Sequence, residues 1–180
     1  MPPRVTPREP PYPESVRSTI DRLTPPGVPP LVLFRVLARD ERLFTRFASG
    51  GLLDRGQLSL RECELVILRT TACHDSEYEW GVHVVAFARK AGFDAAQIHA
   101  TRHGDAQSEC WNQRERLLIA FVDALRTRSS LDDGLFAALR AEFSEEALLE
   151  LLLLHGFYRT VSTLTGVLQL PLEPWGARFS

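Results

Sequence analysis

The chain has 180 residues, 44% of them apolar, and its 21 Lys and Arg against 23 Asp and Glu give a net charge of −2. This length suits a single domain with a sizeable core, and the balanced charge argues against a broad nucleic-acid-binding surface. No apolar run approaches the roughly 18–20 residues of a membrane span. The first residues lack the apolar stretch of a secretory signal, and three cysteines at unmatched spacings fit reduced thiols. We therefore expect a cytoplasmic protein that binds neither nucleic acid nor membrane.

The N-terminal part is predicted to be an arm followed by two helices. Residues 1–13 are rich in proline and are expected to form a flexible arm, with a single domain over residues 14–180. A short helix is expected over Glu14–Leu23. Thr24–Pro30 should break it and start a second helix over Leu31–Ala48, because proline is favoured in the first turn of a helix.

The central stretch, Arg61–Gly92, is predicted to form two helices joined by a short polar turn. Ser59 followed three residues later by Glu62 is a capping box, so the first helix should begin between them. The second helix should run from about Glu77 to Ala91 and stop at the following glycine, which suits the position after a helix end.

Capping patterns predict the remaining helices. Asp94, Asn112 and Ser144 each precede a helical stretch, and Asp132 or Asp133 should start a shorter one. The last long helix is expected to reach about Leu164. No strand-like alternation is present, so the sequence predicts an all-α bundle of about seven or eight helices.

The central stretch carries three ionisable residues that are expected to meet. Glu64 falls on the apolar side of the first helix, where an unpaired carboxylate would cost several kcal/mol and should therefore have a partner. Glu79 and His83 are four residues apart and share a face of the second helix. Because two antiparallel helices would bring Glu64 to the same place, these three residues are the predicted catalytic group. A carboxylate beside an imidazole fixes its tautomer and raises its basicity.

Each of these residues also has a purely structural interpretation. Glu64 could be a core carboxylate paired with an arginine, and His83 a core histidine with satisfied hydrogen bonds. Glu79 could form a surface ion pair with His83 or Lys90. A metal site is a further alternative, since Glu79 and His83 have helical ligand spacing and Glu64 would add a third ligand. Because the second Glu-x-x-His pair of di-iron bundles is missing, we predict no metal and no cofactor.

Four further residues are predicted to bind substrate. Trp80 and Phe87 flank the acid/base pair and would form the pocket wall, although aromatic residues at such positions are more often core. Tyr158 and Arg159 follow His155 on the last long helix, and Arg159 would hold a carboxylate bidentately. The alternative for this helix is core packing, with His155 making one hydrogen bond.

The same residues carry a family resemblance. The motif YEWGVH, followed by AFARKAGFDAAQI and preceded by LSLRECELVILRT, resembles the carboxymuconolactone decarboxylase-like group of the AhpD-like (alkylhydroperoxidase D-like) superfamily. The resemblance runs from about Val28 to Glu173, where it includes HGFYRTVSTLTGVLQLPLE. It implies an AhpD-like helical bundle, a small-molecule substrate and assembly into a homo-oligomer, as a dimer, trimer or hexamer.

The redox branch of that superfamily uses a glutamate, a CxxC pair and a histidine. By position, its glutamate matches Glu64 and its histidine matches His83, whereas its two cysteines match Ser76 and Glu79. The resemblance therefore implies that the disulfide chemistry of that branch is absent, since it needs a thiolate and a resolving thiol. Cys73 lies nearby but has no CxxC partner.

Three functions remain open from the sequence. The first is a cofactor-free enzyme of lyase or isomerase type that uses Glu and His for acid–base chemistry on a small organic acid or lactone-type substrate, by decarboxylation, isomerisation or dehydration. The second is an alkylhydroperoxidase-like antioxidant protein without the CxxC pair. The third is a non-catalytic binding or oligomerisation protein that keeps the fold, since fold does not imply function.

Overall fold

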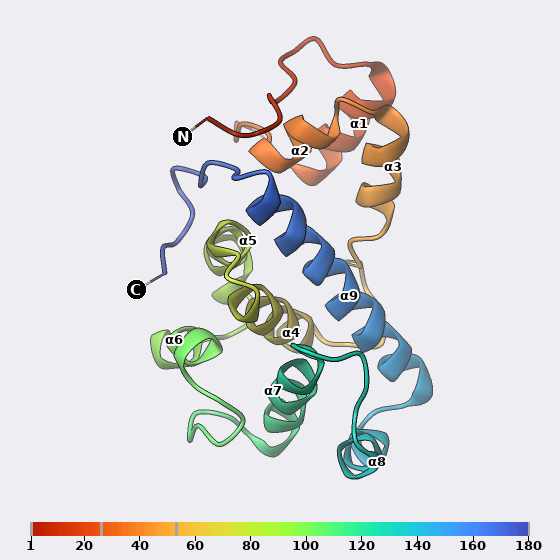
Figure 1. The fold of residues 1–180 in the computed structure, drawn as a ribbon, viewed down its shortest axis with the longest axis vertical. Coiled ribbons are helices and arrows are strands. Elements are labelled where there is room, and N and C mark those ends of the chain that lie inside the picture. The colour runs from red at the N-terminus through yellow and green to blue at the C-terminus, as the bar shows by residue number, and fades with distance from the viewer. Residues whose placement is uncertain (1, 26, 53, 180) are drawn as a thin grey trace.

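The structure, a computed structural model, describes residues 2–25, 27–52 and 54–179, and within these ranges all regular secondary structure is helical (Figure 1). This confirms the predicted all-α class. The described residues form nine α-helices and one π-helical segment: α1 (Glu14–Leu23), α2 (Val32–Leu37), α3 (Glu41–Ser49), α4 (Leu60–Cys73), α5 (Glu77–His83), η1 (Val84–Ala88), α6 (Ala95–His103), α7 (Gln113–Leu125), α8 (Asp133–Glu142) and α9 (Glu145–Val167).

Helix α4 is the centre of the bundle. Every residue from Cys63 to Ala72 is buried, and α5, α6, α7 and α9 all pack against this helix. Figure 1 shows α1–α3 at one end of the molecule and α6–α8 at the other, with α4, α5 and α9 between them. Helix α4 is therefore enclosed on all sides, and any side chain on it that faces α5 is shielded from solvent.

Burial of α4 includes a charged residue on the side away from Glu64. Arg69 is buried and donates two hydrogen bonds to Asp123, at 2.6 Å and 2.9 Å. It also donates to the carbonyl oxygens of Thr101 and Gly104. A buried charge is tolerated when its hydrogen bonds are satisfied in this way, so Arg69 joins α4 to α6 and α7.

The predicted helix starts are confirmed. The side chain of Ser59 accepts a hydrogen bond from the backbone N–H of Glu62, and the Glu62 carboxylate accepts one from the backbone N–H of Ser59. Capping boxes also open α6 at Asp94 and α7 at Asn112, while Ser144 and Asp132 cap α9 and α8. These short-range contacts satisfy backbone N–H groups that the first helical turn leaves unpaired.

Three helix boundaries differ from the predictions. The single helix expected over Leu31–Ala48 is two helices, α2 and α3, because Asp40 interrupts it and accepts a hydrogen bond from Leu43 as the cap of a new helix. The helix expected over Glu77–Ala91 keeps α-helical hydrogen bonding only to His83 and continues as η1. Helix α9 extends three residues beyond the expected end, to Val167.

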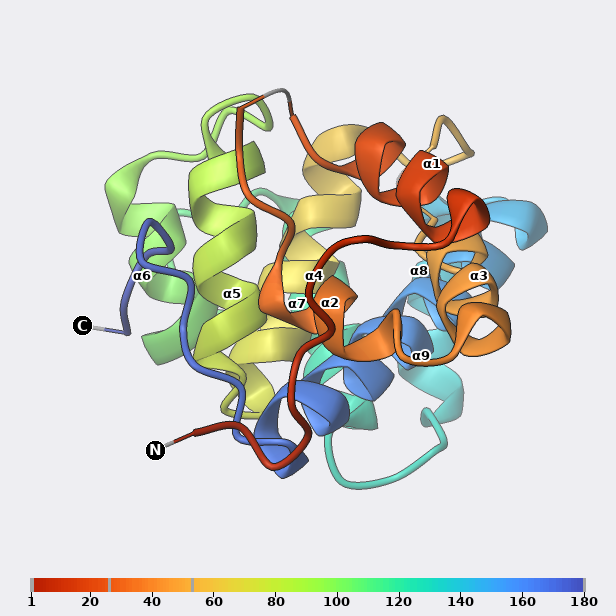
Figure 2. The ribbon, with the colours of Figure 1, turned by 90° about the horizontal axis from the view of Figure 1, so that it is seen from above.

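Both terminal segments are attached to the bundle. In the N-terminal arm, the backbone N–H groups of Arg4 and Arg8 donate to the carbonyl oxygens of Leu168 and Arg35, both at 2.9 Å. Figure 2 shows this segment crossing α2. That the arm is flexible stays a prediction. None of the helices formed by the described residues is long and apolar enough to cross a membrane.

The C-terminal tail, residues 168–179, connects α5 to α2. Buried Glu173 accepts hydrogen bonds from the Tyr78 hydroxyl and from the backbone N–H of Val32. Further on, the Ala177 N–H donates to the Gly81 carbonyl at 3.0 Å, and a Cβ atom at Gly81 would lie only 2.2 Å from the Ala177 oxygen. The tail can approach α5 this closely because residue 81 has no side chain.

Candidate active site

The structure brings Glu64, Glu79 and His83 together, as the sequence predicted. Glu64 comes from the middle of α4, and Glu79 and His83 lie one turn apart on α5, which packs against it. All three are buried, with exposed fractions of 0%, 6% and 3%. Glu79 does pair with His83, but as a buried residue rather than in the surface ion pair that was the alternative for it.

His83 bridges the two carboxylates. Its Nδ1 lies 2.8 Å from Glu64 Oε2, a regular hydrogen bond, and its Nε2 lies 3.4 Å from Glu79 Oε1, a longer ion-pair contact. Both ring nitrogens thus have carboxylate partners, which requires a proton on each of them if both are to donate. Glu64 was expected to have a partner, and the structure shows that this partner is His83 rather than an arginine.

The charges in the cluster favour an imidazolium. Burial alone would lower the pKa of His83, but the charge and hydrogen bond of Glu64, and then the contact with Glu79, raise that pKa to about 10. His83 is therefore protonated at neutral pH and acts as a donor to both neighbours.

Each of the two carboxylates has one oxygen that accepts no hydrogen bond from the described residues of the protein. Glu64 Oε1 and Glu79 Oε2 are buried and have no hydrogen-bond partner in the protein. A buried acceptor without a donor is costly. Of the two residues, Glu79 lines the cavity described below, whereas Glu64 does not.

The cavity beside Glu79 has a volume of about 650 Å³ and a wall that is mostly aliphatic and aromatic. Its lining comes from the segment between α1 and α2, from α3, from α5 and η1, and from α9 and the C-terminal tail. Small-molecule sites commonly have this size and this combination of an apolar wall with few polar groups. At the closed end, Glu79 and His83 supply those polar groups.

The π-helical segment η1 widens the wall that α5 presents to the cavity. Val85, Ala86 and Phe87 are consecutive residues, and all three line the cavity together with His83. A regular α-helix directs consecutive side chains to different faces. Single π-turns often occur at functional sites, and here one follows the central histidine directly.

Two of the four predicted substrate-binding residues line the cavity. The Phe87 ring centroid lies 5.1 Å from that of His83, and the Tyr158 ring meets the His83 ring edge-on at 5.1 Å. Burial, followed by the charges of Glu79 and Glu64, raises the pKa of Tyr158 well above its usual value, so its hydroxyl keeps its proton.

The other two residues lie elsewhere, which corrects their predicted placement. Trp80 is on the opposite side of α5, where its Nε1 donates to Thr101 Oγ1 at 3.0 Å and its ring packs against Phe179. Arg159 is exposed on α9 and does not line the cavity. The physical reason is helical geometry, since Trp80 directly follows Glu79 and Arg159 directly follows Tyr158, and adjacent helical residues point in different directions.

Sequence reasoning missed the rest of the wall. Residues 23–25 and described residues between 27 and 31 line one side, Phe34 and Phe47 line another, and Trp175 contributes from the tail. These residues are far from the catalytic group in sequence. The sequence shows that many of them are aromatic residues or prolines, but not that they lie beside Glu79. Lys90 also lines the cavity, although the sequence had suggested it only as a surface partner of Glu79.

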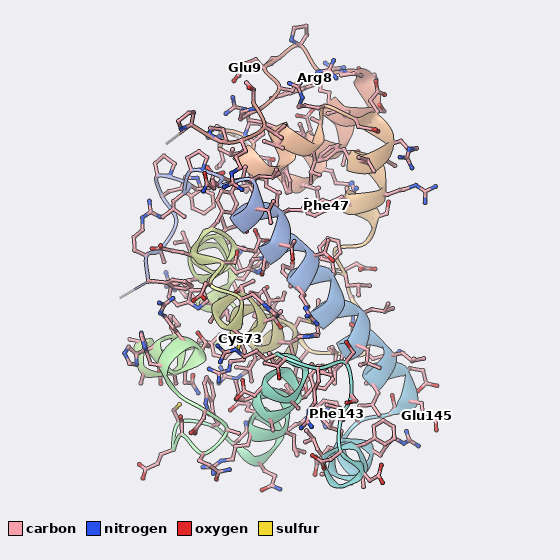
Figure 3. The ribbon with its side chains drawn as sticks, in the orientation of Figure 1. Arg8, Glu9, Phe47, Cys73, Phe143 and Glu145 are labelled. Atoms are coloured by element: carbon pink, nitrogen blue, oxygen red, sulfur yellow. The ribbon has the colours of Figure 1, made fainter. Side chains whose placement is uncertain are left out.

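The three cysteines are poorly suited to thiol chemistry. Burial raises the pKa of Cys63 to about 12 and that of Cys73 to about 11, and the pKa of Cys110 is also raised. None of them lines the cavity, and Figure 3 shows Cys73 well apart from Phe47, which does. A reactive cysteine needs a lowered pKa and access to its substrate.

The family model of the carboxymuconolactone decarboxylase family matches residues 41–123, which include Glu64, Glu79 and His83. The match supports the assignment of this region to the AhpD-like superfamily. The resemblance seen in the central stretch is thereby confirmed, and so is the AhpD-like helical fold. A comparison with curated proteins gave no match.

Solved structures with the same fold are distant in sequence. A peroxidase-related protein with an alkylhydroperoxidase AhpD core, from Ralstonia eutropha JMP134, is 17% identical with a TM-score of 0.74, over 91% of this chain and 87% of that one. The debrominase Bmp8 is 16% identical with a TM-score of 0.72, over 90% and 86%. A Bmp8 variant in complex with 2,3,4-tribromopyrrole is 15% identical with a TM-score of 0.70, over 89% and 83%. At these identities the likeness shows the fold alone.

Proposed function

We propose that this protein is a cofactor-free enzyme that moves a proton at a carbon next to a carbonyl group, on a small organic acid or lactone-type substrate. The observation that carries the proposal is Glu79, a carboxylate with one unpartnered oxygen, among the residues that line an apolar cavity. A general base must be within hydrogen-bond reach of the proton it removes. A substrate in this cavity would lie beside the Glu79 side chain.

In the proposed step, a substrate C–H bond breaks and its proton goes to Glu79 Oε2. The electron pair stays on the substrate as an enolate, whose negative charge is offset by the nearby imidazolium of His83. Return of the proton to another carbon gives isomerisation. In dehydration, the proton held by Glu79 goes instead to a β-hydroxyl group, whose C–O bond breaks so that it leaves as water. In decarboxylation, a C–C bond breaks instead, carbon dioxide leaves, and the same enolate takes a proton from His83.

Glu64 has a positioning role in this scheme. It does not line the cavity, and its contact with the reaction is through His83 Nδ1. The carboxylate holds the ring orientation and keeps the imidazole protonated. Removal of Glu64 should therefore change the pH at which the reaction occurs as well as its rate.

The proposal is tested by exchange of substrate hydrogen for deuterium. A panel of small lactones, β-keto acids and unsaturated carboxylic acids is incubated with the protein in D2O, and the loss of each C–H signal is followed by NMR. E79Q should slow exchange by about 10²–10⁴-fold, the usual contribution of a general base. The matched control is E109Q, which removes an exposed loop carboxylate. Equal exchange in wild type and E79Q, for every compound that exchanges, would reject the proposal.

The alternative functions predict other results with the same protein. A thiol-dependent antioxidant would consume hydroperoxides and lose that activity in C73S, although the raised pKa of Cys73 disfavours it. A binding protein would hold members of the panel without exchange. The Bmp8 complex with 2,3,4-tribromopyrrole supports placing small ring compounds in the panel, because a neighbour with the same fold binds one.

A further inference from the structure

We propose that the cavity binds its ligand in one orientation, with a carboxylate at Lys90 and an apolar body that extends inward to Glu79 and His83. This inference rests on the proposed function, because it places the reacting carbon at the inner end. It assigns the substrate class as amphiphilic carboxylates whose acid group is remote from the reacting centre. Lys90 would then be the residue that determines specificity.

The charges at the two ends of the cavity differ in sign. At the inner end, His83 is already paired with both Glu64 and Glu79, so two carboxylates surround one imidazolium. A ligand carboxylate would be repelled there. Among the described lining residues, Lys90 is the one lysine or arginine, and it makes no ion pair with any described residue. Like-charge repulsion and opposite-charge attraction thus favour the same orientation.

The positions of these groups set an upper limit on the distance between the two ends of the ligand site. The Phe87 ring centroid lies 5.1 Å from the His83 ring and 5.8 Å from Lys90 Nζ. The ammonium is therefore within about 11 Å of the imidazole, with an aromatic ring between them. Because Lys90 is exposed whereas His83 is buried, the cation stands at the solvent end of the cavity.

The mouth of the cavity favours an apolar body. Val28, Val85 and Trp175 line the cavity and are exposed at 37%, 52% and 36% of their surface. Exposed apolar residues of this kind gain free energy when a ligand covers them, by about 25 cal/mol for each Å² of apolar surface removed from water. Affinity should therefore come mainly from the apolar body, and orientation from Lys90.

Calorimetric titration with octanoate and octanamide tests the orientation, since the two ligands differ in charge but little in shape. At low salt, wild type should bind octanoate about two- to five-fold more tightly, which is the range of an exposed ion pair. K90M should bind both ligands equally. The matched control, R89M, removes an exposed neighbouring cation that does not line the cavity, and it should keep the preference.

Equal binding of the two ligands by wild type, or the same loss of preference in R89M as in K90M, would overturn the inference. So would failure of both ligands to bind, because the inference requires that the cavity accept an apolar chain. Contacts between the ligand methyl group and His83, measured by NMR, should be present in wild type. In E79Q the preference for octanoate should persist while exchange is lost. A protein that keeps the preference without any exchange would reject the proposed function alone.

Discussion

Replacement of His83 by glutamine should flatten the dependence of stability on pH between pH 6.5 and pH 8.5. In the folded protein the pKa of His83 is raised from 6.5 to about 10, whereas in the unfolded chain it has its ordinary value. Between the unfolded pKa of 6.5 and the folded pKa of about 10, the folded state holds about one proton more than the unfolded state. The stabilisation is thus fully present below pH 6.5 and is lost as pH rises towards 10.

The magnitude follows from the proton count. A difference of one bound proton changes the free energy of unfolding by about 1.4 kcal/mol per pH unit. Over this window, wild type should lose up to about 2.5 kcal/mol, with the slope smaller near pH 6.5 where the unfolded histidine is half protonated. Above pH 9 the raised pKa values of Cys63 and Cys73 add a loss of the same sign, so the measurement stops before that.

Urea denaturation at several pH values measures this difference. H83Q will be less stable overall, because buried Glu64 loses its charged partner, but its stability should vary little across the window. H99Q replaces an exposed histidine and should keep the wild-type slope. The reasoning would be refuted by a wild-type stability that is constant from pH 6.5 to 8.5, or by an unchanged slope in H83Q.

Two further substitutions probe the packing around the site. Burial, followed by nearby positive charges, lowers the pKa of His155 to about 4. Wild type should therefore lose stability as pH falls from 6.5 towards 4, and H155Q should lose less, as measured by thermal unfolding at pH 5 and pH 7. G81A places a methyl group 2.2 Å from the Ala177 carbonyl oxygen and should cost about 1–3 kcal/mol, with faster proteolysis of the C-terminal tail. G166A, where a methyl group meets nothing within 4 Å, should be neutral or slightly stabilising, and equal behaviour of the two variants would contradict this account.

The sequence was most informative where contacts are local. Capping at Ser59 and Asp94 depends on residues three apart, so pattern alone placed the starts of α4 and α6. The meeting of Glu64 with His83 was also predictable, because one polar residue on each of two adjacent apolar helices needs a partner. Capping was not recognised at Asp40, because its sequence context resembles that of any polar surface residue. In the structure its side chain accepts a hydrogen bond from the backbone N–H of Leu43.

The cavity was less predictable because segments distant in the chain build it. Val28 and Trp175 come from opposite ends of the sequence and line the same cavity only through tertiary packing. Arg159 looked suitable from its neighbour Tyr158, but adjacent helical residues face different directions. The sequence pattern predicted a continuous α-helix through His83 and did not indicate the π-helical turn after it. That turn contributes consecutive side chains to the cavity wall.

The protonation state of His83 tests the central claim most directly. In protein labelled with nitrogen-15, NMR distinguishes an imidazolium from either neutral tautomer. We predict that at pH 7.5 both ring nitrogens of His83 carry protons, and that this state persists beyond pH 8.5. A neutral ring at pH 7.5, or titration near pH 6.5, would contradict the arrangement of one imidazolium between two buried carboxylates.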